Sequence, residues 1–113
     1  MEYRLKRNSD FQKLFRKGNK AFSQSLMILY LPANFTRFGL SVSKKHGNSV
    51  QRNRIKRLLR EAFYGIRGEL IRPLSIIFIP KVSEAYSYKE FACGMRRAFQ
   101  KANLLRQNET TAD

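Results

Sequence analysis

The residues from Ile55 to Ile66 constrain the fold of this chain most strongly. Their apolar side chains recur every three or four residues, which places them along one side of an α-helix. The set is Ile55, Leu58, Leu59, Ala62, Phe63 and Ile66. A helix with such a side must bury it against another layer, so we expect it to form one wall of the core.

The opposite side of the same helix is basic. Its residues are Asn53, Arg54, Lys56, Arg57, Arg60 and Tyr64. Cations three or four positions apart destabilise a free helix by some tenths of a kcal/mol per pair, so the pattern indicates a functional need. Guanidinium groups bind phosphate oxygens in pairs, which favours a polyanionic partner. A basic amphipathic helix can also lie on anionic lipid, but a small domain needs the apolar side for its core.

The charge of the whole chain supports this interpretation. It has 23 Lys and Arg against 8 Asp and Glu, a net charge of +15, and no acidic residue between Asp10 and Glu61. A basic surface that only aids solubility normally mixes both signs. We therefore expect a nucleic-acid partner and an affinity that falls steeply with salt.

The remaining patterns predict two more helices and several strands. Ser9 and Gln12 fit a capping box that opens a first helix, which ends at Gly18 in a left-handed cap. The apolar runs 21–31 and 37–43 are separated by a turn at 32–36 and predict a β-hairpin. Residues 74–79 form a continuous apolar run, typical of an inner strand covered on both faces.

A last helix is announced by Ser87 and Glu90, which fit a second capping box. Its apolar stripe is Tyr88, Phe91, Met95, Phe99 and Ala102. Together these elements predict an α+β fold in two layers. We expect one domain over 1–105 and a disordered tail over 106–113.

Cysteine usage and hydropathy suggest a compartment. The chain has one cysteine, Cys93, so no intramolecular disulfide can form and a reducing cytoplasm is expected. Cys93 is interpreted as a small buried filler of the last helix. The longest apolar runs are far shorter than the roughly 20 residues that span a bilayer, so a soluble, cytoplasmic protein without membrane contact is predicted.

The segment from Lys44 to Glu61 closely resembles the signature of the bacterial ribonuclease P protein family. That signature is a Lys-Lys-x-Gly-x-Ala-Val-x-Arg-Asn-Arg block leading into Lys-Arg-x-x-Arg-Glu. The resemblance extends over residues 3 to 105. Two positions depart from it: Ser49 stands where Ala is usual, and Tyr64 where Arg is frequent.

The resemblance implies a fold and two RNA surfaces. The fold is a two-layer α/β sandwich with a central, mostly antiparallel four-stranded sheet and three helices. The order is αβββαβα, with a left-handed βαβ crossover, as in ribosomal protein domains. The implied contacts to a catalytic RNA subunit are Lys44, Lys45, Arg52, Asn53, Arg54, Lys56, Arg57 and Arg60. The implied contacts to the single-stranded 5′ leader of precursor tRNA, in a cleft between the first helix and the sheet, are Phe11, Lys13, Phe15, Arg16, Lys17 and Tyr30.

From the residues alone, core packing is the favoured interpretation of Phe11 and Phe15, whereas Tyr30 fits packing and binding equally well. The resemblance favours the leader-binding role for both and leaves Leu14 as core. Aromatic rings beside cations suit unstacked RNA bases and their phosphates.

The polypeptide itself lacks a catalytic constellation. His46 is the only histidine, and no second metal-ligating residue or carboxylate pair lies near it in the sequence. The resemblance implies that an RNA subunit hydrolyses the leader with Mg²⁺ held mainly by RNA, and that the protein alone is monomeric with no metal of its own. A small basic ribosomal protein and a self-sufficient nuclease are the alternatives. The full signature block opposes the first, and the missing catalytic groups oppose the second.

Overall fold

A computed structural model describes residues 3–5 and 7–106. The helices and strands in chain order are β1 (Tyr3–Arg4), α1 (Asn8–Lys17), β2 (Asn19–Phe22), β3 (Leu26–Pro32), β4 (Arg37–Leu40), the short 3-10 helix η1 (Lys44–His46), α2 (Ser49–Ile66), the short 3-10 helix η2 (Arg67–Glu69), β5 (Leu74–Pro80) and α3 (Tyr88–Lys101). The predicted order αβββαβα is confirmed from α1 onward. The two-residue β1 precedes it and had no sequence signal.

The strands form one mixed sheet in the order β1-β4-β5-β3-β2. β5 is antiparallel to β3 and parallel to β4, and β2 is antiparallel to β3. β4, α2 and β5 therefore make a parallel βαβ crossover. The predicted hairpin across 32–36 is wrong, because β5 lies between the two strands that this turn connects. The apolar run 21–31 instead breaks into β2 and β3, which pair with each other.

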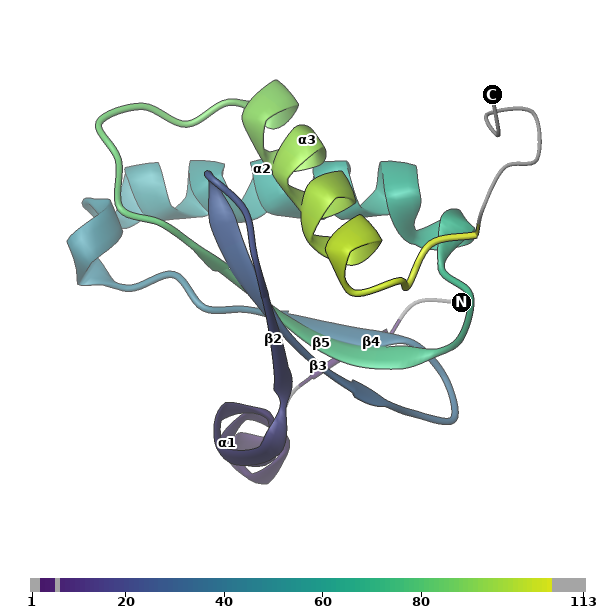
Figure 1. Cartoon of the computed structure of the whole chain (residues 1–113). Coiled ribbons are helices and arrows are strands. Elements are labelled where there is room, and N and C mark those ends of the chain that lie inside the picture. Colours follow the sequence, from purple (N-terminus) through teal and green to yellow (C-terminus); the bar gives the residue numbers. More distant parts are fainter. Residues whose placement is uncertain (1–2, 6, 107–113) are drawn as a thin grey trace, which may run out of the picture.

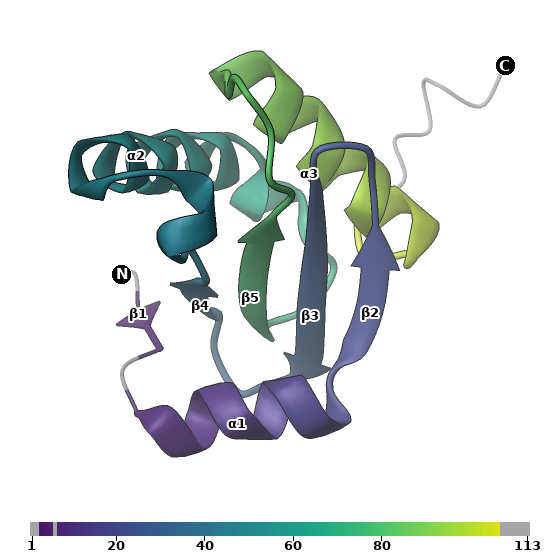
Figure 2. The ribbon, with the colours of Figure 1, turned by 90° about the vertical axis from the view of Figure 1, so that its left-hand side faces the viewer.

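Helices cover both faces of the sheet, as Figures 1 and 2 show. α2 and α3 lie over one face and bury the main core, to which Ile76 and Phe78 of β5 contribute. α1 lies under the other face, where Leu5, Leu14, Leu29 and Ile77 form a small second cluster. The two predicted layers are thus the sheet and the pair of helices α2 and α3. On the opposite face of the sheet, α1 adds a partial third layer. Burial of β5 from both sides confirms it as an inner strand.

The start of α2 is fixed by a capping box that the sequence interpretation missed. The Asn48 side chain accepts from the Gln51 amide at 2.9 Å, and the Gln51 side chain accepts from the Asn48 amide at 2.9 Å. Gly47, just before it, has φ +129°, a conformation that side chains with a Cβ rarely adopt. All six predicted apolar residues of α2 are buried, which confirms the periodicity.

The predicted caps of α1 are wrong at both ends. The helix begins at Asn8 after Arg7, with no side-chain cap, so Ser9 is already inside the first turn. Gly18 ends the helix in an extended conformation and not in a left-handed one. A Cβ at Gly18 would meet the Leu14 carbonyl oxygen, which gives a packing reason for this glycine.

The predicted start of α3 is confirmed. Ser87 is its N-cap, and the Ser87 hydroxyl accepts from the Glu90 amide at 3.1 Å. Phe91, Met95 and Phe99 are buried as expected, whereas Tyr88 is about half exposed. After α3, Leu105 bridges to Leu70, and the Arg106 amide donates to the Glu69 carbonyl at 2.7 Å. Arg106 thus belongs to the folded part, and the rest of the predicted tail lies outside the described residues.

No helix among the described residues is long and apolar enough to cross a membrane.

Candidate nucleic-acid interface

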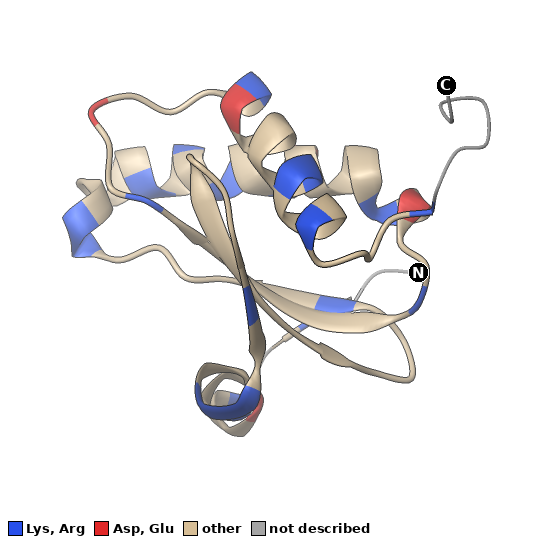
Figure 3. Ribbon diagram, in the orientation of Figure 1, with Lys and Arg blue, Asp and Glu red and all other residues tan. Residues whose placement is uncertain are grey.

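The outward side of α2 carries a continuous row of cations, which we call the α2 basic row and define as Arg52, Lys56, Arg57 and Arg60. Arg57 is exposed and the other three are half-buried. No ion pair joins these four side chains to a carboxylate within residues 3–5 and 7–106. Figure 3 shows Lys and Arg along α2 and also on α1, α3 and η1. The row leaves several guanidinium and ammonium groups available to phosphate oxygens.

Asn53 and Arg54 are both exposed, but they are placed differently. Asn53 lies on the outward side with the α2 basic row. Arg54 turns toward the loop before α3, where its Nη1 donates to the Tyr86 carbonyl oxygen at 3.2 Å. Arg54 therefore joins α2 to that loop as well as carrying charge, so its replacement would affect both.

Lys44 and Lys45 project from η1, just before α2, and both are exposed. His46 anchors this segment through both ring nitrogens. The Ser43 amide donates to Nδ1 at 3.0 Å, so Nε2 carries the proton and donates to the Pro80 carbonyl oxygen at 2.7 Å. The single histidine is thus a structural anchor that fixes the two lysines beside the N-terminus of α2.

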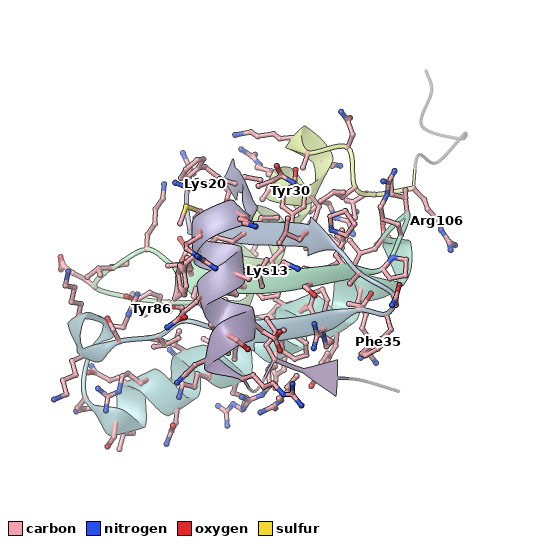
Figure 4. The ribbon with its side chains drawn as sticks, turned by 90° about the horizontal axis from the view of Figure 1, so that it is seen from below. Lys13, Lys20, Tyr30, Phe35, Tyr86 and Arg106 are labelled. Carbon is pink, nitrogen blue, oxygen red and sulfur yellow. The ribbon has the colours of Figure 1, made fainter. Side chains whose placement is uncertain are left out.

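The predicted leader-binding cations lie on the solvent side of α1. Lys13, Arg16 and Lys17 are exposed there, and Figure 4 shows Lys13 on α1. Phe15 is 49% exposed and Leu14 is 2% exposed. Leu14 is therefore the core residue of this helix, as predicted, whereas the exposed ring of Phe15 is free of the core and its role in leader binding stays a prediction.

Two grooves border α1. The larger, about 420 Å³, lies between α1 and the β3–β4 turn, and Lys13, Phe35 and Arg37 line it. The smaller, about 180 Å³, is lined by Phe11 together with Lys56 and Arg60 of α2. Phe11 packs against Gly39, where a Cβ would meet its ring at 2.6 Å. The two predicted RNA surfaces thus meet at Phe11 along the edge of the sheet.

Tyr30 does not join the other predicted leader-binding residues. It is half-buried and packs against the main core, on the face that α2 and α3 cover. Its neighbours Leu29 and Leu31 face α1 instead. Successive side chains of a strand point to opposite faces, so Tyr30 lies on the face of the sheet away from α1 and Phe15. Its predicted place in that cleft is wrong.

Phe35 and Arg37 were missed as candidates. Phe35 is 46% exposed, and the Arg37 guanidinium lies 5.6 Å from the centre of its ring. Arg37 Nη1 also lies 3.4 Å from Asp10 Oδ2, which ties the turn to α1. The sequence did contain a signal for this pair: an aromatic residue stands two positions before an arginine, in a predicted turn that contributes no residue to the core.

Cys93 is exposed and lies at the surface of α3, so its prediction as a buried filler is wrong. Within the described ranges, no group of three or more His, Cys, Asp or Glu residues could hold a metal ion.

Comparisons with known proteins agree with this geometry. The Ribonuclease P family matches residues 1–103. The Ribonuclease P protein component of an Exiguobacterium species is 36% identical over 105 residues, covering 91% of this chain and 92% of that protein. The Ribonuclease P protein component of Clostridium kluyveri is 38% identical over 109 residues, covering 90% and 96%.

Solved structures show the same fold. The Staphylococcus aureus RNase P protein superposes with a TM-score of 0.81 at 28% identity, covering 94% of this chain and all of that one. The RNase P protein from Thermotoga maritima has a TM-score of 0.71 at 23% identity, covering 89% and 94%, and supports the fold alone. With a family match over nearly its whole length and a basic helix built on the family's motif, this chain belongs to the ribonuclease P protein family.

Proposed function

We propose that this chain is the protein subunit of a bacterial ribonuclease P ribonucleoprotein, which removes the 5′ leader from precursor tRNA. In this proposal the α2 basic row, Asn53, Arg54 and the η1 lysines bind the catalytic RNA. The α1 surface binds the leader. The single observation that carries the proposal is the α2 basic row, which forms no ion pair with a carboxylate of the described residues and is held in place by the capping box at Asn48 and by the buried side of the helix.

The polypeptide supplies binding and not hydrolysis. Its described residues offer no metal cluster, so Mg²⁺ would be held mainly by RNA phosphates, which this ion prefers. Cations placed beside the RNA would reduce the repulsion between two polyanions and thereby lower the Mg²⁺ concentration that cleavage needs. We expect the free protein to be monomeric and to act in the cytoplasm.

Reconstitution tests the proposal. The protein is mixed with a bacterial ribonuclease P RNA at low Mg²⁺, and cleavage of precursor tRNA is followed. We expect cleavage with both components and none with the protein alone. Metal-dependent cleavage by the protein without RNA would show a self-sufficient nuclease. Failure of the protein to bind or activate the RNA would favour the ribosomal-protein alternative.

The α2 basic row has its own test. Arg57→Ala should weaken binding to the catalytic RNA and reduce the slope of log affinity against log salt by about one. Arg72→Ala is the matched control, since Arg72 is an exposed cation in the loop before β5. Equal effects of the two variants would mean that total charge, and not the α2 basic row, determines binding.

A further inference from the structure

A third groove lies at the end of the sheet far from the β3–β4 turn. It has a volume of about 410 Å³ and runs between α3, the β2–β3 turn and the loop 81–86. Figure 4 shows Tyr86, on its wall, at one end of the sheet, with Phe35 and Arg106 at the other. We call it the α3 groove. Neither predicted RNA surface includes its lining residues.

The walls of the α3 groove are held together by two hydrogen bonds between Ser25 and backbone atoms of the neighbouring segments. The Ser25 hydroxyl donates to the Glu90 carbonyl oxygen at 2.9 Å, and the Lys81 amide donates to the Ser25 carbonyl oxygen at 3.0 Å. The β2–β3 turn can approach this closely because Gly94 has no side chain. The groove is therefore formed before any ligand arrives.

Tyr86 fixes the remaining wall. Its hydroxyl accepts from the Ser83 amide at 2.8 Å, and its ring stacks on Phe91 with centroids 5.8 Å apart. These contacts order the loop 81–86. Val82, which also lines the groove, is 61% exposed. The lining thus combines apolar surface with a rigid frame.

The charge of the α3 groove is positive. Lys81, Lys89 and Arg97 line it and are exposed. One carboxylate, Glu90, also lines it, and that group accepts from the Ser87 hydroxyl at 3.3 Å. Cations around an apolar lining match a ligand that carries both a flat apolar ring and a phosphate, as a nucleotide of single-stranded RNA does.

We propose that the α3 groove binds a nucleotide of a single-stranded RNA segment, with its base on the apolar lining and its phosphates at Lys89 and Arg97. This rests on the proposed function, because the same RNA would also contact α2. The hydrogen bond from Arg54 to the Tyr86 carbonyl joins the α2 surface directly to the groove wall. The RNA subunit and the precursor tRNA are both sources of such a segment.

Cys93 provides a reporter at the site. It is the single cysteine of the sequence, it is exposed and it lines the α3 groove. The rate at which a small disulfide reagent modifies it is measured on the full chain. The arms are protein alone, with ribonuclease P RNA, with precursor tRNA, with mature tRNA, and with poly-glutamate. Filter binding in the same samples measures how much RNA is bound.

We expect the RNA that occupies the groove to slow modification of Cys93 at least tenfold, and the arm that does so identifies the source. If RNA is bound and the rate is unchanged in every arm, the groove proposal is overturned while the proposed function stands. If no RNA binds, both are overturned. Protection by poly-glutamate equal to that by RNA would indicate an acidic-peptide site and overturn the RNA assignment.

Charge variants separate direct contact from a distant effect. The double variant Lys89→Ala with Arg97→Ala should restore Cys93 reactivity in the complex and reduce the salt slope by about two. Arg72→Ala removes a cation at the opposite end of β5, roughly 20 Å away at about 3.3 Å per strand residue, and should leave the protection unchanged. Full protection in the double variant would refute the groove as the contact.

Discussion

Two helical glycines should respond to the same substitution with opposite signs. Replacing glycine by alanine inside a helix stabilises it by about 1 kcal/mol through propensity. Gly65 in α2 has room for the new methyl group, because the nearest atom outside its helix, the Tyr88 hydroxyl oxygen, would lie 3.4 Å away. Gly65→Ala should therefore stabilise the protein by about 1 kcal/mol and raise the melting temperature by roughly 4 °C.

Gly94 in α3 has no such room. A methyl group there would collide with the Ser25 hydroxyl and come within 2.8 Å of the Ser23 hydroxyl. Overpacking costs about 1–3 kcal/mol. Turning Ser25 away loses its bond to the Glu90 carbonyl, worth about 0.5–1.5 kcal/mol. After the propensity gain, a net loss of about 0.5–3.5 kcal/mol remains, which lowers the melting temperature by roughly 2–14 °C.

Thermal unfolding of the two single variants, followed by circular dichroism, measures the difference. Adding Ser25→Ala to Gly94→Ala should recover part of the loss, whereas Ser25→Ala alone should be mildly destabilising, so that the two sites show a coupling energy. The reasoning is refuted if Gly94→Ala raises the melting temperature as Gly65→Ala does. If the losses of stability caused by Gly94→Ala and Ser25→Ala simply add in the double variant, the destabilisation by Gly94→Ala does not come from a collision with Ser25.

Three further predictions concern the salt bridge, the η1 segment and α1. Arg96 donates two hydrogen bonds to Glu69, at 3.0 and 2.8 Å, and this lowers the pKa of Glu69. The pair therefore stabilises the fold above about pH 4.3, the pKa of an unfolded Glu, and this is lost as the pH falls through the lower folded value. Glu69→Gln should lower the free energy of unfolding at pH 7, measured by urea denaturation, by a few tenths of a kcal/mol. The loss is small because both side chains of the pair are nearly half exposed, and the difference between the two proteins should vanish in strong acid. Gly47→Ala should lower both the melting temperature and the affinity for the catalytic RNA. The backbone angle φ of +129° disfavours alanine, and the new methyl group would displace Gln51 from the cap of α2. An unchanged affinity would contradict a role for this segment in RNA binding. Phe15→Ala should weaken binding of precursor tRNA more than of mature tRNA with little change in melting temperature, unlike Leu14→Ala, and a pure loss of stability would make Phe15 a core residue.

Patterns that depend on one segment were predictable from the sequence. Apolar residues that recur every three or four positions between Ile55 and Ile66 lie on one side of a helix and on no single face of a strand. The continuous apolar run of β5 requires other elements to cover both faces of that strand. The Asn48 and Gln51 cap was visible in principle, because an amide pair three residues apart fits the same signature as the Ser and Glu pair that was recognised at α3.

Features that depend on pairing between distant segments were not predictable. The turn at 32–36 looks like a hairpin locally, but nothing in it tells that β5, forty residues later, inserts between its two strands. The side of β3 that Tyr30 occupies was equally undetermined, since Ile28, Leu29 and Leu31 are apolar on both faces of the strand. Without an alternating pattern, the register of the sheet alone decides which face a residue takes.

The unequal division of apolar surface across the sheet makes α1 the least firmly attached helix. Only Leu14 of α1 is fully buried, whereas six residues of α2 are. Undocking α1 exposes its small cluster with Leu5, Leu29 and Ile77 and the partly buried side chains around it, which is less apolar surface than the main core holds, so this helix should open at a lower free energy than global unfolding. An RNA strand laid across Phe15 and Lys13 would then suppress that opening, and amide protons of α1 would exchange more slowly in the complex than in the free protein.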